Sequence, residues 1–146
     1  GKDGRITGWR DTEQIPAQAG PYLTAIRQDI RLLDREIVPS MGRVLSRVIE
    51  KRGLDPEKVD WFLPHYSSAY FRPKFYDEMA RIGFEIPYER WFTNLSEKGN
   101  TGTAAIFIIL EEIFHSGRLK PGERLLCFIP ESGRFTHCFM HLTVVG

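Results

Sequence analysis

The sequence predicts a domain of the α/β class, with a mixed sheet of about five strands covered by helices. Three observations predict this class. Short apolar segments rich in strand formers alternate with segments of helical periodicity, one helix is apolar on nearly every side, and two strands end the chain. The 146 residues are enough for one domain with its own core, and 42% hydrophobic with 27% charged residues is typical of a globular protein.

The first half of the chain contains two expected strands and one long helix. Residues 1–21 hold four glycines and two prolines with little periodicity, so we expect a lead-in loop or linker. Residues 22–30 favour a strand. Apolar residues then recur at helical spacing across residues 31–52, where Pro39 is expected to kink or split the helix and Gly53 to end it. Residues 59–63 have the composition of a short buried strand.

The second half alternates in the same way. A helix is expected to follow Ser67 or Ser68, with Pro73 in its first turn, and residues 89–93 favour another short strand. The helix expected at residues 103–113 is apolar nearly all round, which predicts burial on every side. Two strands, at residues 124–129 and 135–145, flank a last loop and complete the expected sheet.

Charge and composition exclude several classes of protein. The formal net charge is +1, so there is no general electrostatic case for nucleic acid or for an anionic membrane surface. No apolar run approaches the roughly 20 residues that span a bilayer, and the polar first residues do not resemble a signal peptide. Two cysteines without CxxC spacing favour a reducing, cytoplasmic setting, and no spacing of His, Cys or carboxylates resembles a metal site. The start without Met indicates an excised piece.

Three loops carry side chains that could do chemistry. His65 follows a buried strand, where open α/β sheets place reactive groups, although a histidine held by one hydrogen bond would look the same. Asn100 lies among small residues that open the apolar helix, and its amide could be aimed by that loop or could simply belong to a turn. Glu131 and Arg134 lie in the last loop, where a solvated ion pair is the simpler explanation.

The order of these loops resembles the C-terminal half of the ketoacyl-acyl carrier protein synthase III family. The segments PHYSS and GNTGTAA stand where that family usually has PHQAN and GNTSAA, and a glycine loop precedes the last strand in both. The resemblance covers residues 22–146 and implies the C-terminal half of a thiolase-like fold. It places His65 on the family's catalytic His, Asn100 on its catalytic Asn and Gly133 in its Gly-rich loop.

The resemblance also marks three departures. Ser68 stands where the family usually has Asn, and Glu131 and Arg134 replace small or apolar residues of the Gly-rich loop. We expect these positions to contact substrate and to set a specialised specificity. The nucleophilic Cys of the family belongs to its N-terminal half, so this chain alone is expected to be inactive and to leave an apolar surface exposed.

The resemblance implies a decarboxylative Claisen condensation between an acyl thioester and malonyl-acyl carrier protein, in fatty-acid or polyketide biosynthesis. It implies no cofactor, acyl-CoA or acyl-carrier substrates, and a homodimer in the full-length enzyme. The carrier protein is acidic in this family, so Arg72 and Lys74 are the expected docking residues, with a solvated helix start as the alternative. A non-catalytic partner subunit, or an acyltransferase or thiolase on the same fold, remains an alternative.

Overall fold

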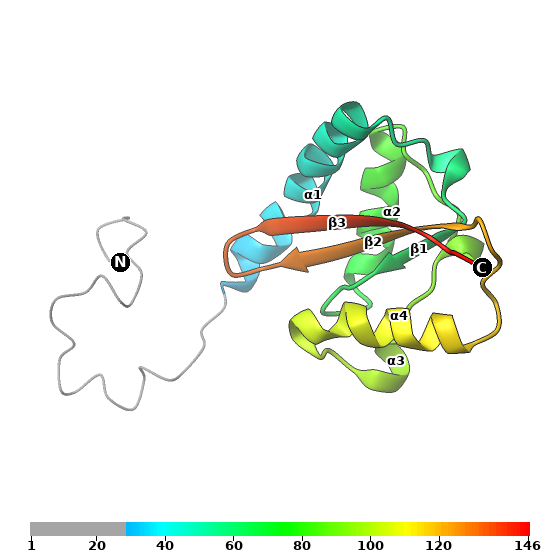
Figure 1. Ribbon diagram of the computed structural model, residues 1–146. Coiled ribbons are helices and arrows are strands. Elements are labelled where there is room, and N and C mark those ends of the chain that lie inside the picture. Colours follow the sequence, from blue (N-terminus) through cyan, green and yellow to red (C-terminus); the bar gives the residue numbers. More distant parts are fainter. Residues whose placement is uncertain (1–28) are drawn as a thin grey trace, which may run out of the picture.

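The computed structural model describes residues 29–146, in which one sheet has helices on both faces (Figure 1). Its elements in chain order are α1 (Ile30–Arg52), β1 (Trp61–Pro64), α2 (Phe71–Arg81), α3 (Leu95–Lys98), α4 (Ala105–His115), β2 (Arg124–Glu131) and β3 (Thr136–Thr143). Single 3-10 turns lie at Pro56–Lys58, Tyr88–Arg90 and Gly102–Ala104. The expected lead-in at 1–21 and residues 22–28 of the first expected strand lie outside the described residues, and Ile30 already belongs to α1.

The sheet has the order β1-β2-β3. Strand β1 runs parallel to β2, with Trp61 opposite Leu125, and β2 runs antiparallel to β3, with Glu131 opposite Thr136. The predicted α/β class and mixed sheet are confirmed. The expected number of about five strands is too high for the described residues, which form three.

The strand expected at residues 89–93 is a turn instead. Residues 88–90 form a 3-10 turn, and only a single parallel bridge joins Trp91 to Phe62. The indole N–H of Trp91 donates to the carbonyl of Ile86 at 2.8 Å, and its ring meets Phe62 edge-on at 4.8 Å. Side-chain packing and one backbone hydrogen bond, from the Phe92 N–H to the Phe62 carbonyl at 2.9 Å, therefore hold this segment against β1, which the strand-forming composition alone could not distinguish from a ladder.

The two faces of β2 belong to two cores. Leu126 and Phe128 face the layer of α1 and α2, whereas Leu125 and Cys127 face α4. All four side chains are buried, as expected for the central strand of a sheet covered on both sides. The first core is the larger and is rich in aromatic rings; its fully buried side chains include those of Phe62, Phe75, Phe84 and Phe128.

Helix α1 has the predicted end but is not split. The side chain of Asp29 accepts a hydrogen bond from the Leu32 N–H at 3.0 Å and caps the first turn, and Gly53 ends the helix at φ 60°. Pro39 lies inside a continuous helix. The carbonyl that loses its helical donor belongs to Arg35, and because both Arg35 and Pro39 are exposed, water can satisfy it and the interruption is tolerated.

Helix α2 begins three residues after Ser68, and Pro73 lies in its first turn as predicted. The Ser68 carbonyl accepts from the Phe71 N–H at 3.0 Å, and its Oγ accepts from the Tyr70 N–H at 3.3 Å. Ser68 thus closes the turn that leads into the helix, although the capping residue itself is Tyr70, without a side-chain bond.

Helix α4 is not buried on every side, contrary to the expectation for residues 103–113. Ile106, Ile109 and Ile113 are buried against the sheet, but Phe107 and Phe114 are 67% and 68% exposed. The apolar pattern predicted burial, but no element within residues 29–146 covers this outer face. In the same range, no helix is both long and apolar enough to cross a membrane.

Candidate active site

The sheet fixes the position of the His65 backbone at the end of β1. His65 directly follows β1, and its backbone N–H donates to the carbonyl of Phe128 in β2 at 2.8 Å, which continues the parallel pairing by one residue. Its side chain is 7% exposed. Burial lowers the pKa of the imidazole from its ordinary value, so the ring is neutral at pH 7 and offers one N–H donor and one bare nitrogen.

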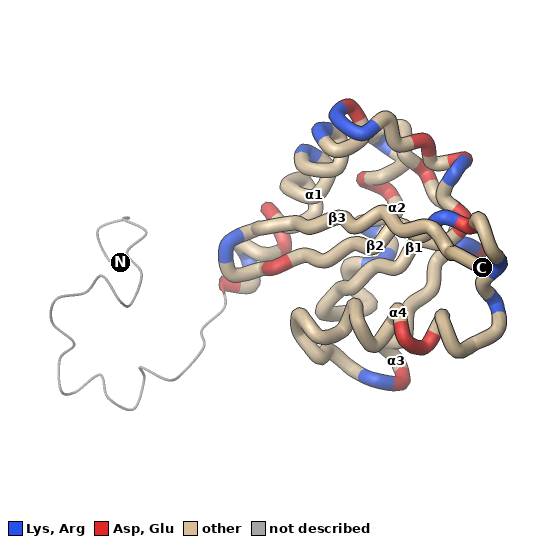
Figure 2. Tube along the Cα trace, in the orientation of Figure 1, with Lys and Arg blue, Asp and Glu red and all other residues tan. Residues whose placement is uncertain are grey.

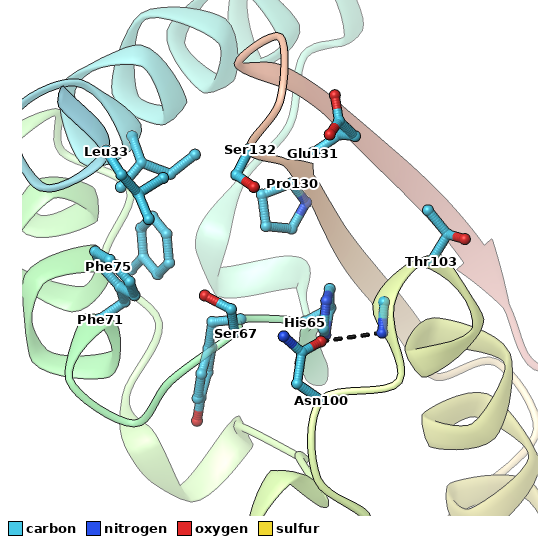
Figure 3. A pocket seen from close by; sticks show the side chains of 13 residues that line it. Leu33, His65, Ser67, Phe71, Phe75, Asn100, Thr103, Pro130, Glu131 and Ser132 are labelled. Atoms are coloured by element: carbon cyan, nitrogen blue, oxygen red, sulfur yellow. Dashed lines mark hydrogen bonds between the residues drawn. The ribbon is translucent and has the colours of Figure 1, made fainter. Parts of the chain in front are cut away.

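Asn100 is oriented by its own loop. Its Oδ1 accepts a hydrogen bond from the backbone N–H of Gly102 at 3.0 Å, which identifies the other amide atom, Nδ2, as the free donor (Figure 3). Gly102 has φ 61°, a conformation that favours glycine, and the turn it begins leads directly into α4. The loop therefore leaves the two N–H donors of Asn100 available to a ligand.

The two side chains line one cavity of about 160 Å³, although they lie 35 positions apart in the sequence. Figure 3 shows His65 beside Asn100, with the apolar side chains of Leu33, Phe71 and Phe75 across from them. His65 and Asn100, which the resemblance places on the family's catalytic His and Asn, thus line the same cavity. The arrangement places neutral N–H donors opposite the apolar side chains of Leu33, Phe71 and Phe75, which suits an oxygen that gains negative charge on an acyl group.

The last loop contributes Glu131, as predicted, and Ser132 to the cavity wall. Gly133 and Arg134 of the same loop do not line the cavity. The Glu131 carboxylate turns back to its own loop, where it accepts from the N–H groups of Gly133 at 2.7 Å and Arg134 at 3.0 Å. Gly133 supports this turn, since a Cβ there would lie 2.8 Å from the carboxylate. Arg134 is exposed and does not line the cavity, so the expectation that it borders the site with Glu131 is not met.

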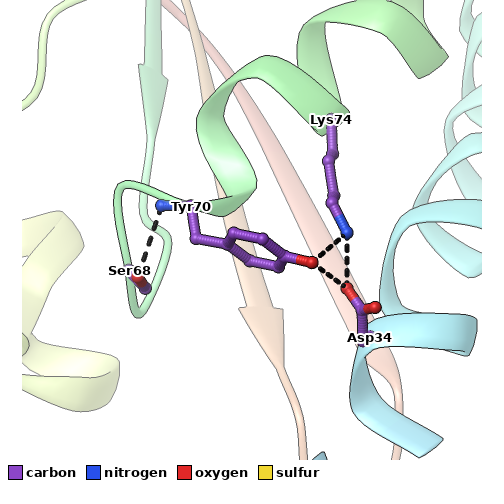
Figure 4. Close-up of polar contacts among 4 residues, drawn as sticks. All are labelled: Asp34, Ser68, Tyr70 and Lys74. Carbon is purple, nitrogen blue, oxygen red and sulfur yellow. Dashed lines mark hydrogen bonds and ion pairs between the residues drawn. The ribbon is translucent and has the colours of Figure 1, made fainter. Parts of the chain in front are cut away.

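Ser68 also lies outside the cavity, and Ser67 lines it instead. Ser68 belongs to a neighbouring network that joins α1 to α2 (Figure 4). In this network Lys74 donates to both the Asp34 carboxylate and the Tyr70 hydroxyl at 2.5 Å, and its Nζ lies 4.0 Å from the Tyr70 ring centroid. The hydrogen bond and ion pair with Asp34 raise the pKa of Lys74, and the same contacts lower the pKa of Asp34.

Arg72, the other predicted docking residue, also has a partner within the chain. Its guanidinium lies 4.6 Å from the Tyr88 ring centroid, and its Nε is buried without a hydrogen-bond partner among the described residues. Neither Arg72 nor Lys74 lines the cavity. Both cations are thus held by intramolecular contacts on the surface of α2, next to the cavity wall that Phe71 and Phe75 provide.

Sequence reasoning missed the walls of the cavity. Leu33 and Ile37 come from α1, Phe71 and Phe75 from α2, and Thr103 from the turn before α4. Leu33 and Ile37 are four positions apart on the apolar face of α1, a pattern that predicts core in general and does not single out a ligand cavity.

No candidate metal site accompanies the cavity. Within residues 29–146, no three His, Cys, Asp or Glu side chains gather so that they could hold a metal ion. Neither cysteine lines the cavity: Cys127 is buried in β2, where burial raises its pKa to about 12, and Cys138 is exposed on β3. This arrangement supplies donors and walls but no reactive thiolate.

Comparison with known proteins identifies the family. Residues 49–133, more than half of the chain, match the family described as 3-oxoacyl-[acyl-carrier-protein (ACP)] synthase III C terminal. The chain belongs to the ketoacyl-acyl carrier protein synthase III family. Both candidate side chains, His65 and Asn100, fall inside the matched segment.

Relatives in this family are much longer than this chain. The β-ketoacyl-[acyl-carrier-protein] synthase III of Novosphingobium aromaticivorans is 30% identical over 128 residues, which cover 85% of this chain and 38% of that protein. The crystal structure of the Aquifex aeolicus synthase III has a TM-score of 0.66 and 30% identity, covering 82% of this chain and 37% of the other. OleA from Xanthomonas campestris has a TM-score of 0.71 and 25% identity, over 80% and 32% of the two chains. The thiolase-like fold and the family predicted from the motifs are confirmed.

Proposed function

We propose that this chain supplies the oxyanion donors of a ketoacyl synthase III-type condensing enzyme, with residues 22–146 forming its C-terminal domain. The reaction is the decarboxylative Claisen condensation of an acyl thioester with malonyl-acyl carrier protein, in fatty-acid or polyketide biosynthesis. One observation carries the proposal: His65 and Asn100 come from separate loops and line one cavity. The alternative of incidental surface loops gives no reason for the two to meet.

The proposed roles follow from where charge develops. As the malonyl thioester loses carbon dioxide, the bond between the carboxylate carbon and Cα breaks, and its electron pair becomes an enolate whose charge lies on the thioester oxygen. The N–H of neutral His65 and the Nδ2–H of Asn100 donate to that oxygen. The enolate carbon then attacks the acyl carbonyl and forms the new carbon–carbon bond, and the thiolate that carried the acyl group leaves with the electron pair of the broken C–S bond. Each preorganised donor of this kind is worth about 2.7–4 kcal/mol in the transition state.

The acyl-carrying thiolate must come from outside this chain. Cys127 is buried with a raised pKa of about 12, and Cys138 does not line the cavity. A thiolase would also need a cysteine base in the last loop, and residues 131–135 contain none. We therefore favour a condensing enzyme in which the N-terminal half of the family provides the nucleophile.

Partners and location are part of the proposal. The names of the relatives include the acyl carrier protein. We propose the acyl carrier protein as the partner of this chain, with acyl-CoA or acyl-carrier thioesters as substrates. We also propose a homodimer for the full-length enzyme. The two free thiols, Cys127 and Cys138, favour the cytoplasm as the location.

The decisive experiment measures malonyl-thioester decarboxylation by the enzyme that contains this chain and the N-terminal half of the family. His65→Ala and Asn100→Ala should each lower kcat by about 10²–10³. Ser68→Ala, outside the cavity, is the matched control and should retain the rate. Full activity in both His65→Ala and Asn100→Ala would contradict the assignment, and a wild-type enzyme without any activity would favour a non-catalytic subunit.

The docking proposal for Arg72 and Lys74 has its own test. Reversing both charges in the same enzyme should raise the KM for the carrier protein and weaken the salt dependence of that KM. Asp34→Asn should have the opposite effect, because it removes the carboxylate that pairs with Lys74. A carrier KM that is unchanged in both variants would remove this surface from the proposal without affecting the roles of His65 and Asn100.

A further inference from the structure

A carboxylate on α4 holds the segment that leads into the loop of Asn100. Glu112 lies seven residues after Ala105, the first residue of α4, or about 10 Å along the helix axis. One of its oxygens, Oε2, accepts a hydrogen bond from Nδ2 of Asn94 at 2.5 Å, and the other, Oε1, lies 3.2 Å from Nζ of Lys98. We call these two contacts the Glu112 clamp.

The clamp reaches both ends of α3. Asn94 precedes this helix, and its carbonyl accepts from the N–H groups of Glu97 at 3.1 Å and Lys98 at 2.9 Å. The Asn94 side chain makes no capping bond to α3 and donates to Glu112 instead. Lys98 is the last residue of the helix, and Figure 2 shows the charged end of α3 and the acidic part of α4 on neighbouring segments. Because a helix of one turn is not stable by itself in water, these contacts help to hold α3 against α4.

The loop between α3 and α4 has little packing of its own. Residues 96–104 are all exposed, and among residues 29–146 a Cβ added to Gly99 or Gly102 would meet no atom within 4 Å outside its chain neighbours. The two glycines have φ of 70° and 61°, and Asn100 lies between them. The position of Asn100 therefore depends on how the two ends of the loop are held.

The core holds one end of this loop, and the clamp contributes to the other. Residues 105–106, which begin α4, are buried against the sheet. At the other end Leu95 packs partly against the first core, and the buried Asn94 bonds to Glu112. The ion pair of Lys98 with Glu112 closes a ring of chain that contains Asn100, and closing a ring leaves the enclosed loop fewer conformations.

The clamp is charged at neutral pH. The hydrogen bond from Asn94, and to a smaller extent the ion pair with Lys98, lowers the pKa of Glu112 from its ordinary value, so the carboxylate is ionised at pH 7. An ionised acceptor makes a stronger hydrogen bond than a neutral one. The neighbouring Glu111 is exposed, and it lies 3.9 Å from His115, one turn further along α4. Glu111 therefore provides a matched control on the same helix.

We propose that Glu112 is a positioning residue for Asn100: its clamp on α3 fixes the loop so that Nδ2 of Asn100 is presented to the cavity. Glu112 does not line the cavity, so it acts through the backbone and not on the substrate. The proposal rests on the role of Asn100 in the proposed function, although the clamp itself can be tested without the reaction. If Glu112 served only to stabilise the fold, its loss would lower stability without a specific effect on Asn100.

The first test measures backbone amide order parameters of the whole chain by NMR. In the wild type we expect values of about 0.85 at Asn100 and Gly102, and Glu112→Ala should lower both below about 0.6. Glu112→Gln keeps an oxygen that can accept from Asn94, so it should retain the wild-type values, as should Glu111→Ala. Circular dichroism and urea midpoints show whether each variant is folded. A loop that is already mobile in the wild type, or equal mobility in Glu112→Ala and Glu111→Ala, would overturn the proposal.

The second test uses the enzyme that contains this chain and the N-terminal half of the family. Glu112→Ala should lower kcat for malonyl-thioester decarboxylation about tenfold or more and change KM less than about twofold, because the donor acts in the transition state. Glu111→Ala should retain the wild-type kcat. In an Asn100→Ala background, Glu112→Ala should change kcat less than about twofold, since the residue through which it acts is already gone.

The outcomes separate the clamp from the proposed function. An equal loss of kcat in the wild-type and Asn100→Ala backgrounds would overturn the proposal, because Glu112 would then act independently of Asn100. A loop that loosens in Glu112→Ala while kcat is unchanged would support the clamp and contradict the role of Asn100 in the reaction.

Discussion

Adding one methyl group at Gly42 tests how α1 and α2 are held together. Gly42 is buried in α1, and a Cβ there would lie 1.8 Å from Oε1 of Glu78 and 2.7 Å from its Cδ. Glu78 is 8% exposed, and Arg81 holds both of its oxygens at 2.7 Å. Gly42→Ala should gain about 1 kcal/mol from helix propensity and lose about 1–3 kcal/mol from overpacking, so it should destabilise the chain by up to about 2 kcal/mol.

The sign of the effect should reverse when Glu78 is removed. In a Glu78→Ala background the clash is absent, and Gly42→Ala should then stabilise the chain by up to about 1 kcal/mol. Urea denaturation of the wild type, both single variants and the double variant gives the four free energies of unfolding that complete the cycle. If Gly42→Ala stabilises the chain equally in both backgrounds, the close approach of Glu78 to α1 is wrong.

Three further predictions concern activity, association and pH. The isolated chain should form no carbon–carbon bond from acyl and malonyl thioesters, and any condensation product seen by chromatography would contradict the site assignment. Phe107→Ser with Phe114→Ser should reduce self-association in sedimentation, because these rings are exposed on α4; a wild type that stays monomeric at high concentration would show that the face does not associate. Burial, with a smaller effect of Arg43, lowers the pKa of His137 to about 4. As the pH falls from about 6.5 to 4, the unfolded state therefore binds a proton that the folded state does not, and stability should fall. His137→Gln should flatten this fall in urea midpoints, and an unchanged slope would contradict the shift.

Local signals in the sequence predicted the ends and types of the long elements well. Gly53 ends α1 as a left-handed residue, and Pro73 lies in the first turn of α2, because both features depend on backbone conformations that particular residues impose. The strand expected at residues 89–93 failed because Trp91 satisfies its packing through its side chain. Strand propensity describes how a residue fits a half-buried surface, and such a surface need not be a ladder.

In the candidate site, too, some residues could be predicted from the sequence and others could not. His65 and Asn100 could be found from their loops, since a motif keeps its spacing along the chain. The cavity walls could not be found, because Leu33 and Phe71 look like ordinary core residues until the tertiary packing brings α1 and α2 to the same place. In the last loop, Glu131 and Arg134 both replace small or apolar residues of the family, so the sequence indicated both equally as substrate contacts. Only the geometry of the turn shows that Glu131 lines the cavity and Arg134 does not.

Two backbone features set the orientation of the neutral donors that line the cavity, His65 and Asn100. The N–H of His65 bonds to Phe128 and sets the ring at the end of β1, where burial keeps it neutral. The turn at Gly102 takes up the oxygen of Asn100 and leaves its N–H groups free. In the proposed reaction, a charged donor would hold the malonyl carboxylate as strongly as the developing oxyanion, whereas neutral N–H groups favour the atom on which charge appears only during the reaction. Under the proposed function, the fold would select the transition state through orientation and burial, so a shift of either loop should be as damaging as the loss of its side chain.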